Sequence, residues 1–294
     1  MNEKQFTRRL KTILQDNNVS RRNEREKSGM INTKRVGLYG TTERIFAHRD
    51  TEKLEKEYSI SLLLDTSGSM RGDEIGLASQ CVNQLAHAIG KINGIKLEIV
   101  TFSASEIQLK GFDEKPPDKD ELFDIAHMLA TGGASVRYYY SEKTGDLFDS
   151  LRGHEPEGDY RLLSSEPWHG ENYDQIAILR AYQRLKNRSG KKIILTFSDG
   201  EPTKGDINEI ASRPGVKTLR GDKKAIKLLQ ANDPSHSFKQ LSKEIGQDTE
   251  VDMIGIGINT NAVKRYYEYN TAVYHLEELY PETVRILNKV IKKS

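Results

Sequence analysis

Short apolar runs alternate with amphipathic stretches along most of the chain, and this alternation is the strongest constraint on its fold. Four of the runs cover residues 58–65, 95–102, 191–199 and 251–258. Short, continuously apolar strands are typical of a parallel sheet that is buried on both faces. Helical spacing of apolar residues between the runs completes the pattern. We therefore predict an α/β fold with a doubly wound, mostly parallel central sheet, helices on both faces and an N-terminal extension.

The remaining elements follow from the same patterns, except in one long segment. Residues 131–170 break the rhythm, since they are rich in Gly, Tyr and polar residues without long periodicity. A connection of that length is uncommon inside a compact domain and is often functional. Elsewhere we predict helices over 74–92, 118–130, 172–186, parts of 221–247, 262–269 and 281–293, an edge strand over 106–112 and a last strand over 271–276.

The N-terminal part differs in character from the rest. Residues 1–57 are predicted to form a basic arm and a lead-in segment that packs on the main domain, which covers 58–294 and contains the long insertion at about 131–170. The arm contains one amphipathic turn. The segment around it is either a free arm or a helix that docks on the main domain. It carries the apolar residues Phe6, Leu10, Ile13 and Leu14.

Composition excludes several functional classes and predicts a cytoplasmic protein. The 45 Lys and Arg nearly balance the 43 Asp and Glu, so a net charge of +2 gives no broad reason to expect a nucleic-acid or membrane surface. The single cysteine, Cys81, cannot form an internal disulfide, which suits a reducing compartment. The sequence has neither the apolar core of a signal peptide nor a run long enough for a membrane helix.

Oxygen-bearing side chains follow the first of the four apolar runs, in the stretch LLLDTSGSM at 62–70. In open α/β sheets ligands bind beyond the carboxyl ends of the strands, which is where Asp65 falls. Asp65, Ser67 and Ser69 together offer three hard oxygens in one tight turn, the ligand type that Mg²⁺ or Mn²⁺ prefers. The alternative is that Asp65 and Ser67 only cap a helix that begins near Arg71.

A second acidic strand end favours the metal site. The stretch IILTFSDG at 193–200 places Asp199 at the end of another central strand. Two carboxylates at neighbouring strand ends need a cation or a proton between them. We therefore expect Asp65 and Asp199 to share a divalent cation.

These motifs resemble those of a known family. DTSGSM followed by FSDG is similar to the metal-ion-dependent adhesion site of von Willebrand factor type A (VWA) domains. The stretch GENYDQIAILRAYQRLKNRSGKKIILTFSDGEP, then VDMIGIGI and RYYEYNTAVYHLEEL, resembles the C-terminal module of CobT, the cobaltochelatase subunit that works with an AAA+ ATPase. The resemblance covers roughly residues 25–294 and implies the VWA fold.

The resemblance also implies a set of metal ligands. Ser67 and Ser69 would bind the ion directly, Asp65 usually through water, and Asp199 through water or directly. Where many members of the fold have a threonine on a second loop, this chain has Gly170-Glu171-Asn172, which makes Glu171 the matching candidate. Glu171 would add negative charge to the site and weaken its grip on a partner's carboxylate. Reserve candidates, each also readable as a loop or cap residue, are Ser164, Ser165, Asn172 and Asp174.

Other motifs give little support for catalysis. The chain contains neither a GxxxxGK[ST] phosphate loop nor a GxSxG nucleophile motif, and Cys81 falls within a predicted helix. We therefore do not expect an enzyme acting alone. The tract 136–140, with its three tyrosines, could be a binding hot spot, a stacking surface for bases, or an apolar cluster that holds the insertion in place.

Three functions are consistent with the sequence. The first is a non-catalytic, Mg²⁺-dependent interaction module that docks on an AAA+ ATPase of the MoxR or CobS kind, with a homo-oligomeric ring as one form of the complex. The second is a subunit of a metal chelatase acting on a corrin; CobT itself is longer, with a large N-terminal portion and an acidic stretch, so this function ranks second. The third is a nucleic-acid-associated factor that uses the basic arm, although the small net charge of +2 argues against nucleic acid as a partner.

Overall fold

The computed structural model describes backbone in most of the predicted elements. The described residues are 2–15, 20–26, 30–31, 46–51, 57–103, 106–114, 124–127, 135–141, 147–151, 160–167, 172–200, 238, 241–243, 245 and 251–293.

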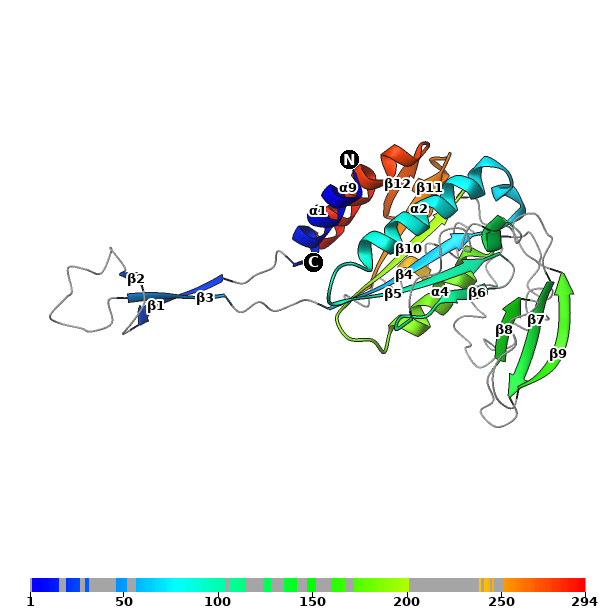
Figure 1. Ribbon diagram of the computed structural model, residues 1–294, viewed down its shortest axis with the longest axis horizontal. Helices are drawn as coiled ribbons and strands as arrows, with labels where there is room; N and C mark the ends of the chain where they lie inside the picture. Colours follow the sequence, from blue (N-terminus) through cyan, green and yellow to red (C-terminus); the bar gives the residue numbers. More distant parts are fainter. Residues whose placement is uncertain are drawn as a thin grey trace.

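A six-stranded sheet forms the centre of the molecule (Figure 1). Its strand order is β12-β11-β10-β4-β5-β6, and all neighbouring strands are parallel except β5 and β6. This confirms the predicted α/β fold with a mostly parallel sheet, and the edge strand was predicted correctly. The strands are β4 (Tyr58–Asp65), β5 (Ile95–Phe102), β6 (Glu106–Lys110), β10 (Lys191–Ser198), β11 (Val251–Ile258) and β12 (Tyr269–Val273).

Helices cover both faces of this sheet, as the continuous apolar strands predicted. In β4, Leu62 and Leu64 pack into one core and Leu63 packs into the other. Because successive strand residues point to opposite faces, a strand buried on both sides must be apolar at nearly every position. The first core includes residues of α1 (Glu3–Gln15), α2 (Asp73–Ile89) and α9 (Leu276–Lys293). The second includes residues of α4 (Asp174–Leu185) and the helical residues Phe238, Leu241 and Ile245.

The N-terminal helix α1 docks on the domain, in agreement with one of the two interpretations of its amphipathic turn. Phe6, Leu10 and Leu14 are buried, and the Phe6 ring stacks on the Tyr280 ring of α9 with centroids 4.4 Å apart. α1 runs beside α9 in Figure 1. Spacing of four residues places these three side chains on one face of the helix. The N-terminal segment therefore contributes directly to the main core.

A small antiparallel sheet follows α1 in the sequence. Its strands are β1 (Ser20–Glu26), β2 (Met30–Ile31) and β3 (Phe46–Thr51), in the order β1-β3-β2. Figure 1 shows this sheet apart from the six-stranded sheet. The predicted division of the chain at residue 58 stays a prediction, and most of the segment 37–46 lies outside the described residues.

The long insertion contains regular structure that its composition did not predict. Its strands β7 (Ser135–Ser141), β8 (Leu147–Leu151) and β9 (Tyr160–Pro167) form an antiparallel sheet in the order β8-β7-β9. The tyrosine tract lies in β7, and tyrosine is favoured in strands. Strands of only five to eight residues are too short for their periodicity to stand out in the sequence. The described residues of the segment therefore form a third β-sheet.

The C-terminal elements differ in their bounds from the prediction. Helix α9 begins at Leu276, five residues before the predicted start at Pro281. The Glu278 carboxylate accepts hydrogen bonds from the backbone N–H groups of Tyr274 and His275, which stabilises the added first turn. The predicted helix over 262–269 is the short 3₁₀ helix η4 (Ala262–Arg265). Helices were also predicted over 118–130 and within 221–247, and the residues that the structure describes in these ranges are helical.

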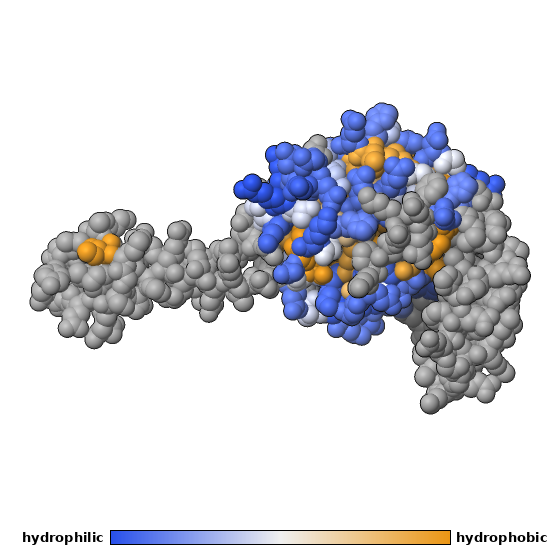
Figure 2. Space-filling model, viewed as in Figure 1, coloured by the Kyte–Doolittle hydropathy of each residue, from blue (hydrophilic) through white to orange (hydrophobic). Residues whose placement is uncertain are grey.

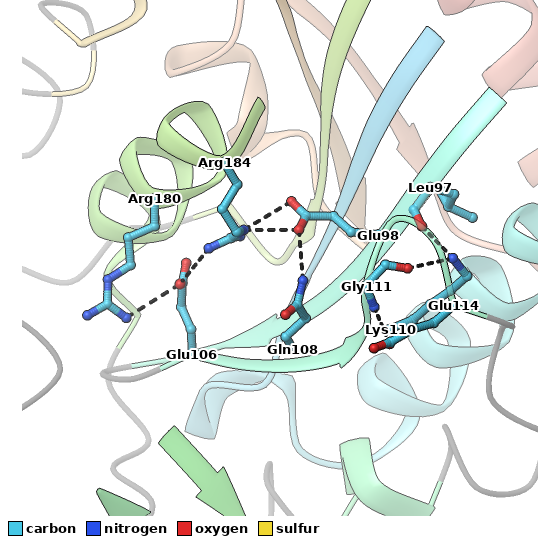
Figure 3. Close-up of polar contacts among 9 residues, drawn as sticks. All are labelled: Leu97, Glu98, Glu106, Gln108, Lys110, Gly111, Glu114, Arg180 and Arg184. Carbon is cyan, nitrogen blue, oxygen red and sulfur yellow. Dashed lines mark hydrogen bonds and ion pairs between the residues drawn. The ribbon is translucent and has the colours of Figure 1, made fainter. Parts of the chain in front are cut away.

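A buried ion network joins α4 to the edge of the sheet (Figure 3). Glu98 of β5 is fully buried and accepts hydrogen bonds from Arg184 Nε, at 3.0 Å, and from Gln108 Nε2, at 3.2 Å. Glu106 of β6 accepts from Arg184 at 3.2 Å and from Arg180 at 3.4 Å. Two acids therefore face two arginines, and the paired charges hold α4 against β5 and β6.

The described surface is mainly hydrophilic on the face shown in Figure 2, with smaller apolar areas between the charged side chains. Among the described helices, none combines the length and the apolar character that crossing a membrane requires.

Candidate metal centre

The first loop of the site follows β4 directly. Asp65 and Ser67 are buried, whereas Ser69 is exposed. The Ser67 backbone N–H donates to Asp65 Oδ1 at 2.8 Å, and the hydroxyl oxygens of Ser67 and Ser69 lie 3.0 Å apart. Thr66 donates from its N–H and its hydroxyl to the Phe102 carbonyl, at 2.8 and 3.0 Å, which anchors the loop to the end of β5. The two serine hydroxyls are thus close enough to bind one ion.

Helix capping does not account for these residues. The turn 68–70 forms the 3₁₀ helix η2, and the Ser67 side chain makes no capping hydrogen bond within the described part of the chain. Helix α2 begins only at Asp73, with Gly72 at its N-cap. Gly72 has φ +92°, a conformation that favours glycine. The capping alternative for Asp65 and Ser67 is therefore wrong for α2.

The end of β10 forms the second wall of the site. Phe197 pairs with Leu64, which brings the following residues Ser198 and Asp65 to the same edge of the sheet. Ser198 Oγ donates to Asp65 Oδ2 at 2.7 Å and accepts a hydrogen bond from the Gly200 N–H at 3.0 Å. The strand end therefore binds Asp65 through Ser198 and leads directly to Asp199.

Gly200 allows the end of β10 to pass close to the 3₁₀ helix η4. Its φ is +87°, and a Cβ atom at this position would lie 2.8 Å from the backbone nitrogen of Val263 in η4. Both the backbone conformation and the close approach require glycine. The glycine of the FSDG motif thus fixes the direction in which the chain leaves Asp199.

The segment before α4 supplies the third wall. Asn172 is buried, and its Nδ2 donates to Asp65 Oδ2 at 2.6 Å and to Ser198 Oγ at 3.3 Å. The Tyr173 N–H donates to the Ser103 carbonyl at 3.3 Å, which ties this segment to the chain after β5. Glu171, predicted to replace the threonine of other VWA domains, lies outside the described residues. Its neighbour Asn172, a reserve candidate, is the residue that contacts Asp65.

A further carboxylate is buried beside this segment. Asp174 is the first residue of α4 and is 0% exposed. Its Oδ1 accepts no hydrogen bond of normal geometry from any residue that the structure describes, and its Oδ2 is 3.5 Å from the Tyr267 hydroxyl. A buried carboxylate is normally hydrogen-bonded through both oxygens. Asp174 is therefore poorly satisfied by the protein alone.

The electrostatics of the site show that these acids act on one another. Burial and then the charge of Asp199 raise the pKa of Asp65 to about 7, against the lowering effect of its hydrogen bonds from Ser198 and Ser67. Burial and the charges of Asp65 and Asp199 raise the pKa of Asp174 well above its usual range. The charges of Asp65, Asp174 and Asp199 thus act on one another in a largely buried region.

A divalent cation fits this arrangement. A cation would offset the repulsion and the desolvation that raise the pKa values of Asp65 and Asp174. The available ligands are hydroxyl and carboxylate oxygens, which favour a hard ion. Across the described residues, no three His, Cys, Asp or Glu side chains form a metal-binding group by themselves. An ion bound here therefore needs the serine hydroxyls as well as the acids.

The sequence located most of the described site but missed two supporting residues. The structure brings together Asp65, Ser67 and Ser69, and Asp199 acts on Asp65 from the next strand end. Ser198, which holds Asp65, stands beside Asp199 in the FSDG motif and could have been found there. No motif or periodicity in the sequence marks Tyr267 as a residue of the site. Ser164 and Ser165 lie in β9, and their side chains are outside the described part.

Comparison with known families decides the assignment. The sequence family described as the VWA domain of the cobalamin biosynthesis protein CobT matches residues 45–116 and 160–293, more than half of the chain. The chain belongs to the CobT VWA family. The matched residues include the ends of β4 and β10 and the segment that contains Asn172 and Asp174. Strands β7 and β8 of the inserted sheet fall in the unmatched gap.

Several solved structures are similar in outline. Proximal thread matrix protein 1 from the mussel byssus is 13% identical with a TM-score of 0.42 over 80% of this chain and 46% of its own length, and it has also been solved with zinc in its MIDAS motif. This CobT-type chain thus spans about half of the mussel protein. The minor pilin PilB from Streptococcus sanguinis is 14% identical (TM-score 0.48; 84% and 64% covered). The vWF domain of the type V pili tip protein Mfa5 from Porphyromonas gingivalis is 12% identical (TM-score 0.43; 80% and 96% covered).

Proposed function

We propose that this CobT-type VWA domain is a non-catalytic interaction module that works through a bound divalent cation, Mg²⁺ or Mn²⁺. The observation that carries the proposal is the convergence of the Ser67 and Ser69 hydroxyls with the buried acid Asp65 at one edge of the sheet. The ligands we assign are Asp65, Ser67, Ser69 and Asp199, with Glu171 or Asn172 from the segment before α4. An ion held at this edge can present an open coordination position to a partner.

The partner we propose is an AAA+ ATPase of the MoxR or CobS kind in the cytoplasm, within a ring-shaped complex. Membership of the CobT family supports this partner, since the resemblance implies a subunit that works with such an ATPase. The chain has no phosphate-binding loop of its own. ATP hydrolysis would therefore come from the partner, and this domain would transmit it to a client.

A subunit role in a metal chelatase is the second candidate. The description of the matching family, a cobalamin biosynthesis protein, favours it. In this role the cation in the domain would remain a resident ion, and the cobalt that is inserted would be a substrate bound elsewhere in the complex. Cobalt insertion into a corrin by the reconstituted complex would separate this role from an adaptor for another client.

The test measures ion binding and partner binding with the same variants. Ser67→Ala should weaken Mn²⁺ binding, followed by electron paramagnetic resonance, and abolish capture of the candidate ATPase in Mg²⁺. Wild-type capture should disappear in EDTA. The matched control is Ser79→Ala, because Ser79 is a buried serine of α2 that bonds only the Gly76 carbonyl among the contacts described. Equal capture with Mg²⁺ and with EDTA would show that the partner binds another surface.

A further inference from the structure

Asp174 is the buried acid that the proposed ligand set leaves out. It is fully buried, its Oδ1 accepts no hydrogen bond of normal geometry from the described residues, and its Oδ2 lies 3.5 Å from the Tyr267 hydroxyl. Leaving a buried charged group unsatisfied costs free energy. A cation near Asp174 would offset this cost.

The position of Asp174 connects it to the cation site. It lies two residues after Asn172, which holds Asp65 at 2.6 Å. Asp65 and Asp199 both act on it through their charges, and the Asn172 amide lowers its pKa from nearby. The three acids thus form one electrostatic group around the edge of the sheet.

The helix that begins at Asp174 does not explain its burial. An acid in a first turn stabilises a helix through the macrodipole, and this effect is available at exposed positions without the cost of desolvation. Tyr173, at the N-cap, makes no capping hydrogen bond through its side chain in the described region. A neutral asparagine at position 174 would fit the same space without a buried charge.

Tyr267 is held so that its hydroxyl lies next to Asp174. The ring is 2% exposed and packs directly on Gly255, where a Cβ atom would lie 2.4 Å from the ring atom Cδ2. The ring also packs against Phe238 with centroids 4.8 Å apart. Such packing leaves the ring little freedom to turn its hydroxyl elsewhere.

We propose that Asp174, positioned by Tyr267, adds negative charge to the cation site without binding the ion directly, so that the site remains negatively charged when it holds a divalent ion. The inference rests on the proposed cation site. Together, the negative charges of Asp65, Asp199 and Asp174 exceed the charge of one divalent ion, and this excess is larger still if Glu171 is the ligand from the segment before α4. Because Coulomb energy scales with the product of the charges, the third acid favours trivalent over divalent ions. The ratio of the affinities for trivalent and divalent ions therefore reports the charge of Asp174.

The experiment compares the binding of Mn²⁺ and Tb³⁺ to the full chain. Mn²⁺ binding is followed by electron paramagnetic resonance, and Tb³⁺ binding by displacement of Mn²⁺. We expect Asp174→Asn to weaken Mn²⁺ binding about tenfold and Tb³⁺ binding about thirtyfold, because the Coulomb energy that is lost is larger for the trivalent ion. Tyr267→Phe removes only the hydroxyl and should weaken both ions by a smaller factor, about threefold.

Controls separate this role from a structural one. Asp113→Asn removes an exposed acid that pairs with Lys96 and Arg188, and it should leave both affinities unchanged. In EDTA, the free energy of unfolding of Asp174→Asn should be at least as large as that of the wild type. Unchanged affinities in Asp174→Asn, or equal losses for both ions, would overturn the inference while leaving the cation site in place. Failure of the wild type to bind either ion would overturn both.

Discussion

Asn172 donates a hydrogen bond of 2.6 Å from its Nδ2 to Asp65 Oδ2 and thereby joins the segment before α4 to the end of β4. These residues are 107 positions apart in the sequence. Ser198 donates to the same Asp65 oxygen from the end of β10. Asp65 is therefore the point at which three separate segments meet, and its position determines where an ion can bind.

Removing the Asn172 amide should loosen this junction. In Asn172→Ala, Asp65 loses one of its donors, and we expect the free energy of unfolding in EDTA to fall by about 1–3 kcal/mol, the usual cost of an unsatisfied buried polar group. Mn²⁺ affinity should fall as well, because Asp65 is less well placed. Urea denaturation and electron paramagnetic resonance measure the two effects. Asn93→Ala, in an exposed turn, is the control, and similar losses in that variant would argue against a specific role.

Stability should depend on pH in opposite directions with and without the cation. Asp65 has its pKa raised from 3.8 to about 7 in the folded protein. Between these values the folded form keeps a proton that the unfolded chain has lost, so the ion-free protein loses stability as pH rises through this window, by up to about 1.4 kcal/mol per pH unit.

Saturating Mg²⁺ should reverse this trend, because ion binding requires the deprotonated carboxylates. Denaturation across the same pH window, in EDTA and in Mg²⁺, measures the difference. Parallel pH profiles in the two conditions would mean that Asp65 and the ion are not linked.

The N-terminal helix should contribute to stability without affecting the site. Phe6 is completely buried and stacks on Tyr280. Phe6→Ala should therefore lower the free energy of unfolding by about 3–5 kcal/mol, as expected for a large buried aromatic side chain. Mn²⁺ affinity of the folded protein should not change. Lys4→Ala, on the exposed side of α1, is the matched control; a loss near zero for Phe6→Ala would mean that α1 does not dock in solution.

The ion network beneath α4 should behave as a coupled unit. Arg184→Met leaves the fully buried Glu98 without its main cationic partner (Figure 3), and we expect a loss of about 3–5 kcal/mol in the free energy of unfolding. Adding Glu98→Gln should restore part of this loss, because it removes the unpaired charge. A double-mutant cycle from urea denaturation measures the coupling. Additive effects of the two substitutions would contradict the pairing.

Local patterns explain which features the sequence predicted well. The bounds of β4 and β5 follow from their apolar runs, and Asp65, Ser67 and Ser69 lie within five residues of one another, so their proximity needs no knowledge of the tertiary fold. Ser198 and Asn172 depend on the register of β10 and on the path before α4. Tyr267 reaches Asp174 only because Gly255 leaves room for its ring. Contacts of this kind join distant segments, and neither periodicity nor motif spacing encodes them.

The central claim is that the oxygens of Asp65, Ser67 and Ser69 hold a divalent cation at the edge of the central sheet. Crystals grown without metal and then soaked in Mn²⁺ provide the most direct test, through anomalous scattering from the ion. The account predicts one strong anomalous peak next to the Ser67 and Ser69 hydroxyls, and predicts its loss in Ser67→Ala. A fully soaked crystal with no peak at this position would contradict the account.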